Sequence, residues 1–369
     1  MSKLQNRPRV RRMVERAARR GLRAVGAPES PSPVPAGEPA EPPVPASQPP
    51  SAGDFAREVT PGGFAQLEQN RASGLLYERL DADDVAEVER LIAESSDLNA
   101  FYAAATDPAT RHHMIFAFGI WLNAPVIPRK TGLPDAQPEE HVHVMARGAT
   151  AAAGGLYEAD LIVDALRSAE IDMERMSSAL DFGCSSGRVT RVLAAAYPQI
   201  HWHGCDPNSP AIAWASENLP GIDFFVSDDA PPLPLAEGSL DLVYAISIWS
   251  HFAPELGLRW FEEMHRLLRP GGHLVCTTHG LTSVAYYATL ALRTVEQSQE
   301  IRDSLYRGGC WYAPEFGEEG DWGVVNPDWG TAFLSPEWML THLCPRWRVV
   351  EFAPGRNQEN QDVYVLQRV

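Results

Sequence analysis

Residues 179–195, ALDFGCSSGRVTRVLAA, constrain the fold of this chain more than any other stretch. The apolar start predicts a buried strand, and apolar residues recur at helical spacing from Val189 onward. Between them lies a tight turn with Gly183 and Gly187, where the backbone can bend sharply and approach a ligand closely. The first helical turn then offers unpaired N–H groups. The stretch therefore predicts a strand–turn–helix unit that holds an anionic or polar ligand.

The next predicted strand, residues 199–205, is followed by an acid. Asp206 comes 19 residues after Gly187, which is the place from which a carboxylate accepts hydrogen bonds from ribose hydroxyls in α/β folds. The glycine spacing is not G-x-G-x-x-G, which disfavours an oxidoreductase that uses a nicotinamide dinucleotide. The two features together predict a site for a nucleoside-containing cofactor.

Residues 181–187, DFGCSSG, resemble motif I (D-x-G-x-G-x-G) of the class I S-adenosylmethionine (SAM) dependent methyltransferases. Ser185 stands where the middle glycine usually lies. The loop 227–235 and the LRPGG sequence at 268–272 are also similar to that family. The resemblance covers about residues 157–369. It implies an α/β fold, namely a doubly wound, Rossmann-like sheet of seven strands, with SAM as the cofactor.

The resemblance also implies which residues contact the cofactor. Asp181, Gly183 and Gly187 would surround the methionine part, Asp206 the ribose, and Asp229 the adenine. The further candidates on the same loops are Cys184, Ser185, Pro207, Asp228 and Ala230. Tyr157 precedes the motif in a predicted helix and is either a cofactor contact or a packing residue.

Two histidines follow the fourth and fifth predicted strands, at the edge where open α/β sheets bind ligands. Histidine suits proton removal because its ordinary pKa lies near neutral pH. His251 is the first choice for a catalytic base and His279 the second, although His251 could equally cap the next helix. The fourth strand does not end in N-P-P-Y or D-P-P-Y, the pattern with which some N-methyltransferases hold an amino group.

The function expected from these features is O-methylation of a hydroxyl on a small molecule or glycan. N- or C-methylation stays open, as does a non-catalytic SAM-binding scaffold. The net charge of −17 argues against a nucleic-acid substrate, because contacts with phosphates need a basic surface. Five cysteines without a C-x-x-C pair predict reduced thiols in a cytoplasmic protein.

The sequence outside the motif region suggests three further parts. Residues 1–27 carry a charge of +8 and form either an amphipathic helix on an anionic membrane or acidic partner, or a disordered tail. Residues 28–53 hold ten prolines and read as an extended linker. The pattern of residues 54–150 predicts a helical segment that caps one edge of the domain that follows. Residues 281–340 are rich in aromatic residues and form either a lid that stacks on sugars or a packed subdomain.

No metal site is expected from the histidines considered. His112-His113 and His141-x-His143 lack further ligands at defined spacing, so they are interpreted as solvent or loop histidines.

Overall fold

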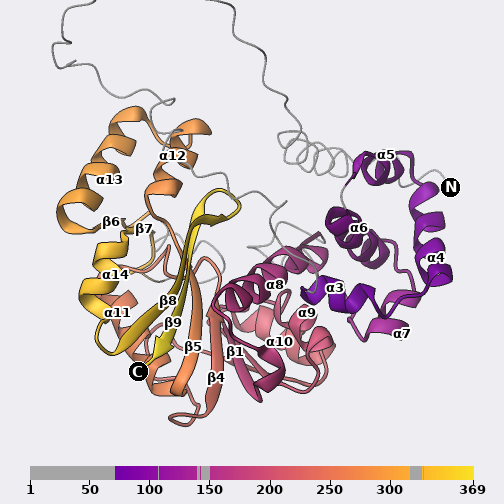
Figure 1. Ribbon diagram of the computed structural model, residues 1–369, viewed down its shortest axis with the longest axis horizontal. Coiled ribbons are helices and arrows are strands. Elements are labelled where there is room, and N and C mark those ends of the chain that lie inside the picture. Colours follow the sequence, from indigo (N-terminus) through magenta and orange to yellow (C-terminus); the bar gives the residue numbers. More distant parts are fainter. Residues whose placement is uncertain (1–70, 107, 139–141, 143–149, 316–325, 327) are drawn as a thin grey trace, which may run out of the picture.

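The computed structural model describes residues 71–106, 108–138, 142, 150–315, 326 and 328–369 (Figure 1). The arm and linker predicted for residues 1–53 lie outside these ranges, as do His141, His143 and the lid residues 316–325. Among the described helices, none combines the length and the apolar content that crossing a bilayer requires.

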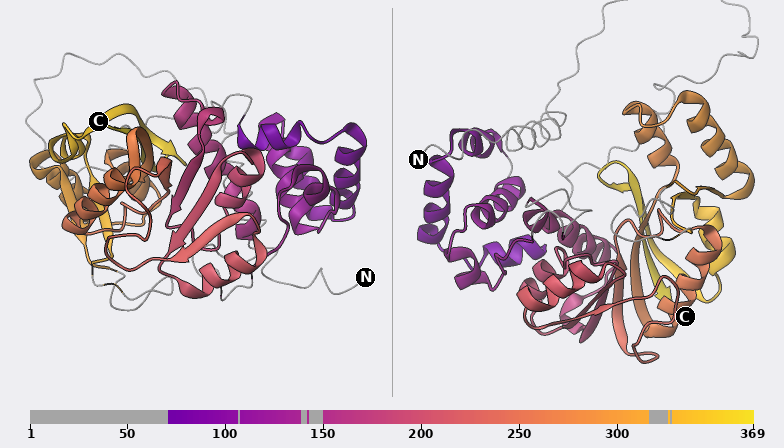
Figure 2. Two further views of the ribbon diagram at one scale, coloured as in Figure 1. Left: turned by 90° about the horizontal axis from the view of Figure 1, so that it is seen from below. Right: turned by 180° about the vertical axis from the view of Figure 1, so that it is seen from behind.

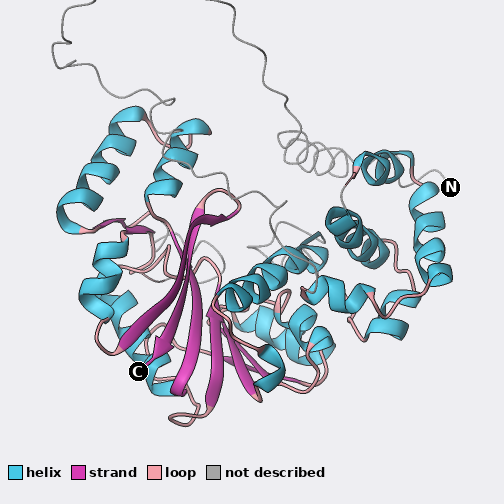
Figure 3. Ribbon diagram, viewed as in Figure 1, coloured by secondary structure: helices cyan, strands magenta, loops and turns pink. Residues whose placement is uncertain are grey.

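A seven-stranded sheet in the order β3-β2-β1-β4-β5-β9-β8 forms the centre of the molecule (Figure 3). The strands β1 to β5 run parallel to one another, while β9 lies antiparallel between β5 and β8. The order turns back on itself beside β1, which is the topological switch point where such sheets bind ligands. The strands are β1 Ser178–Phe182, β2 His201–Asp206, β3 Ile222–Val226, β4 Leu240–Ala245, β5 Leu268–Thr278, β8 Trp347–Asn357 and β9 Gln361–Arg368.

Helices cover both faces of the sheet because its strand residues alternate between two cores. Ala179 of β1 packs into the core on the side of α8, α9 and α10, and Leu180 packs into the core on the side of α11 and α14. The fold is therefore α/β and doubly wound, as the sequence predicts. These helices are α8 Thr150–Ser168, α9 Thr190–Ala196, α10 Ser209–Asn218, α11 Pro254–Leu267 and α14 Pro336–Leu343.

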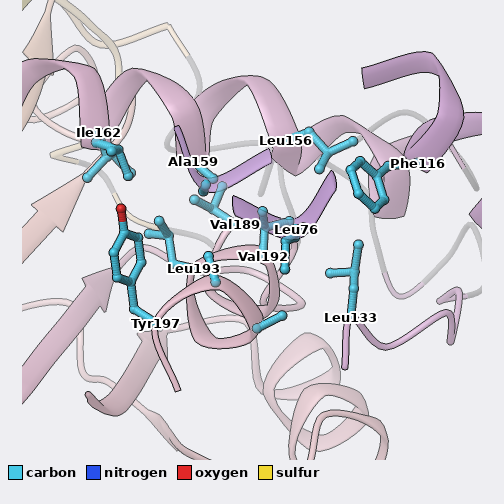
Figure 4. Packing of buried hydrophobic residues seen from close by; sticks show 14 of the residues in the cluster. Leu76, Phe116, Leu133, Leu156, Ala159, Ile162, Val189, Val192, Leu193 and Tyr197 are labelled. Atoms are coloured by element: carbon cyan, nitrogen blue, oxygen red, sulfur yellow. The ribbon is translucent and has the colours of Figure 1, made fainter. Parts of the chain in front are cut away.

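The helices before α8 form a separate layer that packs on α8 and α9 (Figures 1 and 2). Leu76, Phe116 and Leu156 share one apolar core with the residues of α9 (Figure 4). Buried Asp160 of α8 also accepts hydrogen bonds from the backbone and hydroxyl of Ser73. These helices are α3 Ala72–Tyr77, α4 Ala82–Ala93, α5 Ser96–Ala104, α6 Pro108–Trp121 and α7 Val126–Thr131.

A subdomain follows β5 and contains α12 (Leu281–Thr289), α13 (Val295–Gly308) and a two-stranded sheet, β6 (Cys310–Ala313) with β7 (Thr331–Leu334). Phe333 of β7 is fully buried in its small apolar core, whereas Tyr306 is 68% exposed. Phe333 also forms a bridge with His279, directly after β5. The subdomain therefore sits over the end of β5 that carries a predicted site residue.

Three details differ from what the local sequence favours. The prolines at 125, 128, 134 and 138 favour a loop, but the segment contains the helix α7, in which Pro128 occupies an early position. Pro270-Gly271-Gly272 favours a turn but lies within β5, which starts at Leu268. His112 and His113 are on the helix α6 rather than in a loop: His112 stacks on Tyr77, and His113 pairs with buried Asp160.

Candidate functional site

The motif turn, residues 181–187, lies at the carboxyl end of β1. The backbone N–H groups of Gly183 and Cys184 both donate to the carbonyl of Cys205 in β2, at 2.9 and 3.0 Å. Gly183 has a φ of +84°, and a Cβ there would lie 2.2 Å from Cδ1 of Ile248, beyond β4. The turn thus needs a glycine both for its backbone conformation and for the close approach of the segment after β4.

Asp181 is held inside the motif turn. Its carboxylate is 4% exposed and accepts a hydrogen bond of 2.6 Å from the hydroxyl of Thr190 in α9. Burial raises the pKa of Asp181 to about 7, and the hydroxyls of Thr190 and Tyr244 limit that rise. This carboxylate therefore ties β1 to α9.

Asp206 links the end of β2 to the same turn. Its Oδ2 accepts the backbone N–H of Ser185 at 2.8 Å, and its Oδ1 accepts that of Asn208 at 2.9 Å. Each carboxylate oxygen can accept two hydrogen bonds, so both retain acceptor capacity. Burial raises the pKa of Asp206, and the two N–H donors oppose that rise. The group fits the role of accepting ribose hydroxyls.

Ser185 adopts the left-handed conformation, with a φ of +51°. Glycine reaches this region without a steric penalty, which explains why the family pattern has glycine at this position. The serine keeps the geometry of the turn, because its N–H still reaches Asp206.

The other predicted cofactor residues line the strand ends around Asp206. Asp228 and Asp229 are exposed on the loop after β3, and burial together with the charge of Asp228 raises the pKa of Asp229. Cys184 is buried, and burial raises the pKa of its thiol well above the ordinary value. Pro207 and Ala230 are partly buried in the loops after β2 and β3.

Tyr157 of α8 contacts the hairpin between β8 and β9. Its hydroxyl donates to the carbonyl of Arg356 at 3.2 Å and accepts the N–H of Gln358 at 3.0 Å. Burial raises the pKa of this phenol to about 12. These bonds give Tyr157 a packing role between α8 and the hairpin, and a cofactor contact stays a prediction.

A second group of polar side chains gathers at the ends of β4, β5 and β9. We call it the histidine network; its members are Ser247, Ser250, His251, Thr277, His279, Tyr287 and Gln361. The rings of His251 and His279 lie edge to face with centroids 6.3 Å apart. The structure thus brings together the two predicted base candidates, which are 28 residues apart in the sequence.

Both histidines are neutral and have a defined tautomer. His251 Nδ1 lies 2.9 Å from the carbonyl of Gly330, and His279 Nδ1 lies 3.1 Å from that of Ala332. A carbonyl only accepts, so each Nδ1 carries the proton and each Nε2 carries the lone pair. Burial lowers the pKa of His251 to about 4 and that of His279 to about 3.

Gln361 connects the network, and the sequence reasoning missed it. Its amide nitrogen donates to the hydroxyl of Ser247 at 2.7 Å, and its amide oxygen accepts from Thr277 at 2.8 Å. His279 Nε2 lies 3.3 Å from this amide and 3.2 Å from the hydroxyl of Tyr287. The lone pair of His279 therefore faces two possible donors inside the network.

One hollow lies away from these residues, at the opposite, amino edge of the sheet. It measures about 400 Å³ and is lined in part by Asp241, Arg269 and His273. Asp241 accepts from the backbone of Ser177 at 2.6 Å and also pairs with Arg269. Its polar groups bind one another, so this hollow offers no set of converging groups for chemistry.

Known proteins resemble this chain through the strands that carry the motif turn. Residues 179–272 match the family model described as a methyltransferase domain. Malonyl-[acyl-carrier protein] O-methyltransferase of Methylococcus capsulatus is 30% identical over 115 residues, which are 29% of this chain and 38% of that protein. Trans-aconitate 2-methyltransferase of an Acidovorax species is 34% identical over 95 residues, 26% of this chain and 35% of that protein.

The chain thus spans less than half the length of these curated relatives. Among solved structures, a SAM-dependent methyltransferase from Methanosarcina mazei has a TM-score of 0.40 at 19% identity, over 54% of this chain and 94% of that one. The matched segment, residues 179–272, contains the motif turn, Asp206 and Asp229. Its strands are β1 to β4 and the first part of β5. Over residues 179–272, the chain therefore matches a methyltransferase domain.

Proposed function

We propose that this chain transfers a methyl group from SAM to an oxygen atom of a small-molecule or glycan acceptor. The observation that carries the proposal is that the motif turn and the histidine network lie at the same edge of the sheet. Ile248 packs against Gly183 of the turn, and His251 follows three residues later. One short segment therefore connects a cofactor site with a pair of neutral histidines.

The residues present fit the cofactor. SAM, when bound, supplies an electrophilic methyl group on its sulfonium. Asp206 would hold the ribose through the acceptor capacity that its two backbone bonds leave. Asp229 would accept from the adenine amino group, and the backbone of residues 183–187 would approach the methionine part. Fixing two partners in this way can account for about 7–11 kcal/mol of barrier reduction.

His251 is the proposed base for a hydroxyl acceptor. The carbonyl of Gly330 holds the proton on Nδ1, so Nε2 is the atom that would take the proton of the hydroxyl. Its neutral form dominates at pH 7, because burial lowers the pKa to about 4.

An acceptor carboxylate is the second candidate, and the same pKa favours it. A histidine with a pKa of about 4 holds a transferred proton weakly, whereas a carboxylate is already ionised and needs no base. The relative from Methylococcus capsulatus is named an O-methyltransferase, which supports oxygen as the atom that is methylated.

The test is the formation of S-adenosylhomocysteine with matched acceptors that differ only in carrying a hydroxyl, a carboxyl or an amine. A hydroxyl acceptor predicts that His251→Gln lowers kcat about 10²–10⁴-fold while SAM affinity is kept. A carboxylate acceptor predicts that kcat changes by less than about tenfold in the same variant. The matched control is His342→Gln on α14, which should match the parent chain. Methylation of amines alone would overturn the proposal.

Contact of residues 1–27 with an anionic membrane is a separate proposal, supported by their charge of +8. Vesicles containing phosphatidylserine should sediment the full chain at low salt. A chain lacking residues 1–27 should stay in the supernatant. Equal sedimentation of both chains would contradict this role.

A further inference from the structure

Two histidines and an aspartate meet on the outer strands of the sheet, away from the histidine network. His201 and His203 lie on β2, and Asp223 lies on β3. The register pairs His203 directly with Asp223, and the two histidines are separated by one residue on the same face of the strand. The backbone pairing thus brings three side chains together from two strands.

The distances between their ligand atoms suit a metal ion. His201 Nε2 lies 2.7 Å from Asp223 Oδ2, and His203 Nδ1 lies 4.0 Å from the same oxygen. All three ligand atoms lie within 4.8 Å of one another. Bonds of about 2.0–2.2 Å to a tetrahedral zinc ion place neighbouring ligand atoms about 3.3 Å apart. Small rotations of the two exposed side chains would reach that separation.

The face that carries these residues is open to solvent. Trp202, between the two histidines, points to the other face and packs in the same core as Ala215 of α10. The side chains of His201 and Asp223 are 58% and 67% exposed, and that of His203 is 15% exposed. The imidazole rings stack with centroids 4.5 Å apart. A cation can therefore enter from solvent, while hydrogen bonds between the strands hold the ligands' backbone.

The ligand set determines which cation fits. Two imidazoles and one carboxylate favour zinc, copper or nickel over calcium or magnesium, which prefer oxygen ligands. Three protein ligands leave one position of a tetrahedral ion for water or another ligand. The net charge of −17 also attracts cations to the chain. From this geometry we infer that His201, His203 and Asp223 form a binding site for a divalent transition metal of the zinc class.

This proposal departs from the sequence-based expectation of no metal, which considered only His112-His113 and His141-x-His143. The pattern His201-Trp202-His203 lies within a strand, and its third ligand comes from the pairing of β2 with β3. The site is independent of the proposed methyl transfer. His201 starts β2 and Asp206 ends it, so about 16 Å of extended chain separates the two sites.

The experiment is calorimetric titration of the full chain with Zn²⁺ alone, in a buffer that does not bind zinc. The expected result is a site with one ion per chain. Its affinity should fall at least tenfold in His203→Gln and in Asp223→Asn. Binding of S-adenosylhomocysteine, measured on the same samples, should be unchanged and so shows that the variants are folded.

Two control variants locate the site. His342→Gln, on α14, and the double variant His141→Gln/His143→Gln should keep the affinity of the parent chain. Absence of zinc binding by the parent chain would overturn the inference. So would a zinc affinity that survives His203→Gln but is lost in the double variant.

Discussion

The motif turn and the histidine network lie at the same edge of the sheet, but they are built in opposite ways. The motif turn and Asp206 span 26 consecutive residues, and backbone N–H groups make most of their contacts. The histidine network joins side chains from the segment after β4, the end of β5, α12 and β9, so its contacts cross up to 114 residues of sequence. One region depends on local backbone geometry, and the other depends on the assembled fold.

The two regions also differ in charge. The motif turn concentrates carboxylates, and burial raises the pKa of Asp181 to about 7. The histidine network holds neutral rings, with pKa values of about 4 and about 3. A cationic sulfonium would be favoured beside the carboxylates, whereas the neutral rings leave the acceptor side without a fixed charge. The difference is consistent with the proposal that the motif turn binds the cofactor and the histidine network faces the acceptor.

The largest expected effect tests whether the motif turn depends on close backbone approach. Gly183 and Gly221 have nearly the same φ, +84° and +83°, but a Cβ clashes only at Gly183. Gly221→Ala should cost about 1–2 kcal/mol of unfolding free energy through backbone strain alone. Gly183→Ala should cost about 1–3 kcal/mol more, because Ile248 must move, and should weaken SAM binding at least tenfold. Denaturant unfolding and calorimetry measure both. Equal losses in the two variants would show that the approach of Ile248 is unimportant.

The next effect tests the histidine network. Gln361→Leu leaves Ser247, Thr277 and His279 without their amide partner in a buried region, which should cost about 2–4 kcal/mol. Gln367→Leu, on the outer part of the same strand, should cost less than about 1 kcal/mol. SAM affinity should stay within about threefold of the parent value in both variants. A loss of SAM binding in Gln361→Leu would mean that the two regions are not separable.

The pH dependence of stability should have opposite signs in the two regions. The pKa of His279 is lowered from 6.5 to about 3, so the unfolded chain binds more protons between these pH values. This histidine therefore reduces stability as the pH falls from 6.5, and His279→Gln should flatten the slope by up to about 1.4 kcal/mol per pH unit. The pKa of Asp181 is raised from 3.8 to about 7, so this group adds stability as the pH falls through that window.

The control for that measurement is Asp181→Asn. It removes the stabilising protonation, so its stability relative to the parent chain should decline as the pH falls from 7 to 3.8. Urea unfolding at several pH values measures both slopes. For each variant, the slope of unfolding free energy against pH is compared with that of the parent chain. A change of the same sign in His279→Gln and Asp181→Asn would contradict the assigned pKa directions.

The smallest effect concerns Ser185. Ser185→Gly relieves a left-handed φ of +51° but adds conformational freedom to the unfolded chain. The free energy of unfolding should therefore rise by at most about 1 kcal/mol. Ser185→Ala keeps the backbone strain and should show no such gain. SAM affinity should be unchanged in both, since the N–H to Asp206 is kept. A tenfold change in affinity would show that the serine hydroxyl contacts the cofactor.

The contrast between the regions also explains what the sequence could predict. The elements α10 and β3 can be predicted from the sequence, because the apolar pattern and the turn residues that specify them are local. Asp206 was predictable for the same reason, since its distance from the glycines is fixed by one strand–helix–strand unit.

The histidine network was only partly predictable. The two histidines follow strands, so their place at the sheet edge could be inferred. Gln361 could not, because its partners are 82 to 114 residues away and depend on β9 pairing antiparallel with β5. The left-handed φ of Ser247, +63°, has no signal in the sequence either. The same limit applies to Asp223, which reaches His203 only through strand register.

The most direct test of the account is the affinity for SAM and S-adenosylhomocysteine, measured by calorimetry for the parent chain, Asp206→Asn and Asp223→Asn. Asp206 lies at the end of β2 beside the motif turn, whereas Asp223 is an exposed acid on the neighbouring strand. The account predicts binding of both ligands by the parent chain, a loss of about 10–100-fold in Asp206→Asn, and no change in Asp223→Asn. Equal affinities in all three proteins, or no binding by the folded parent chain, would contradict it.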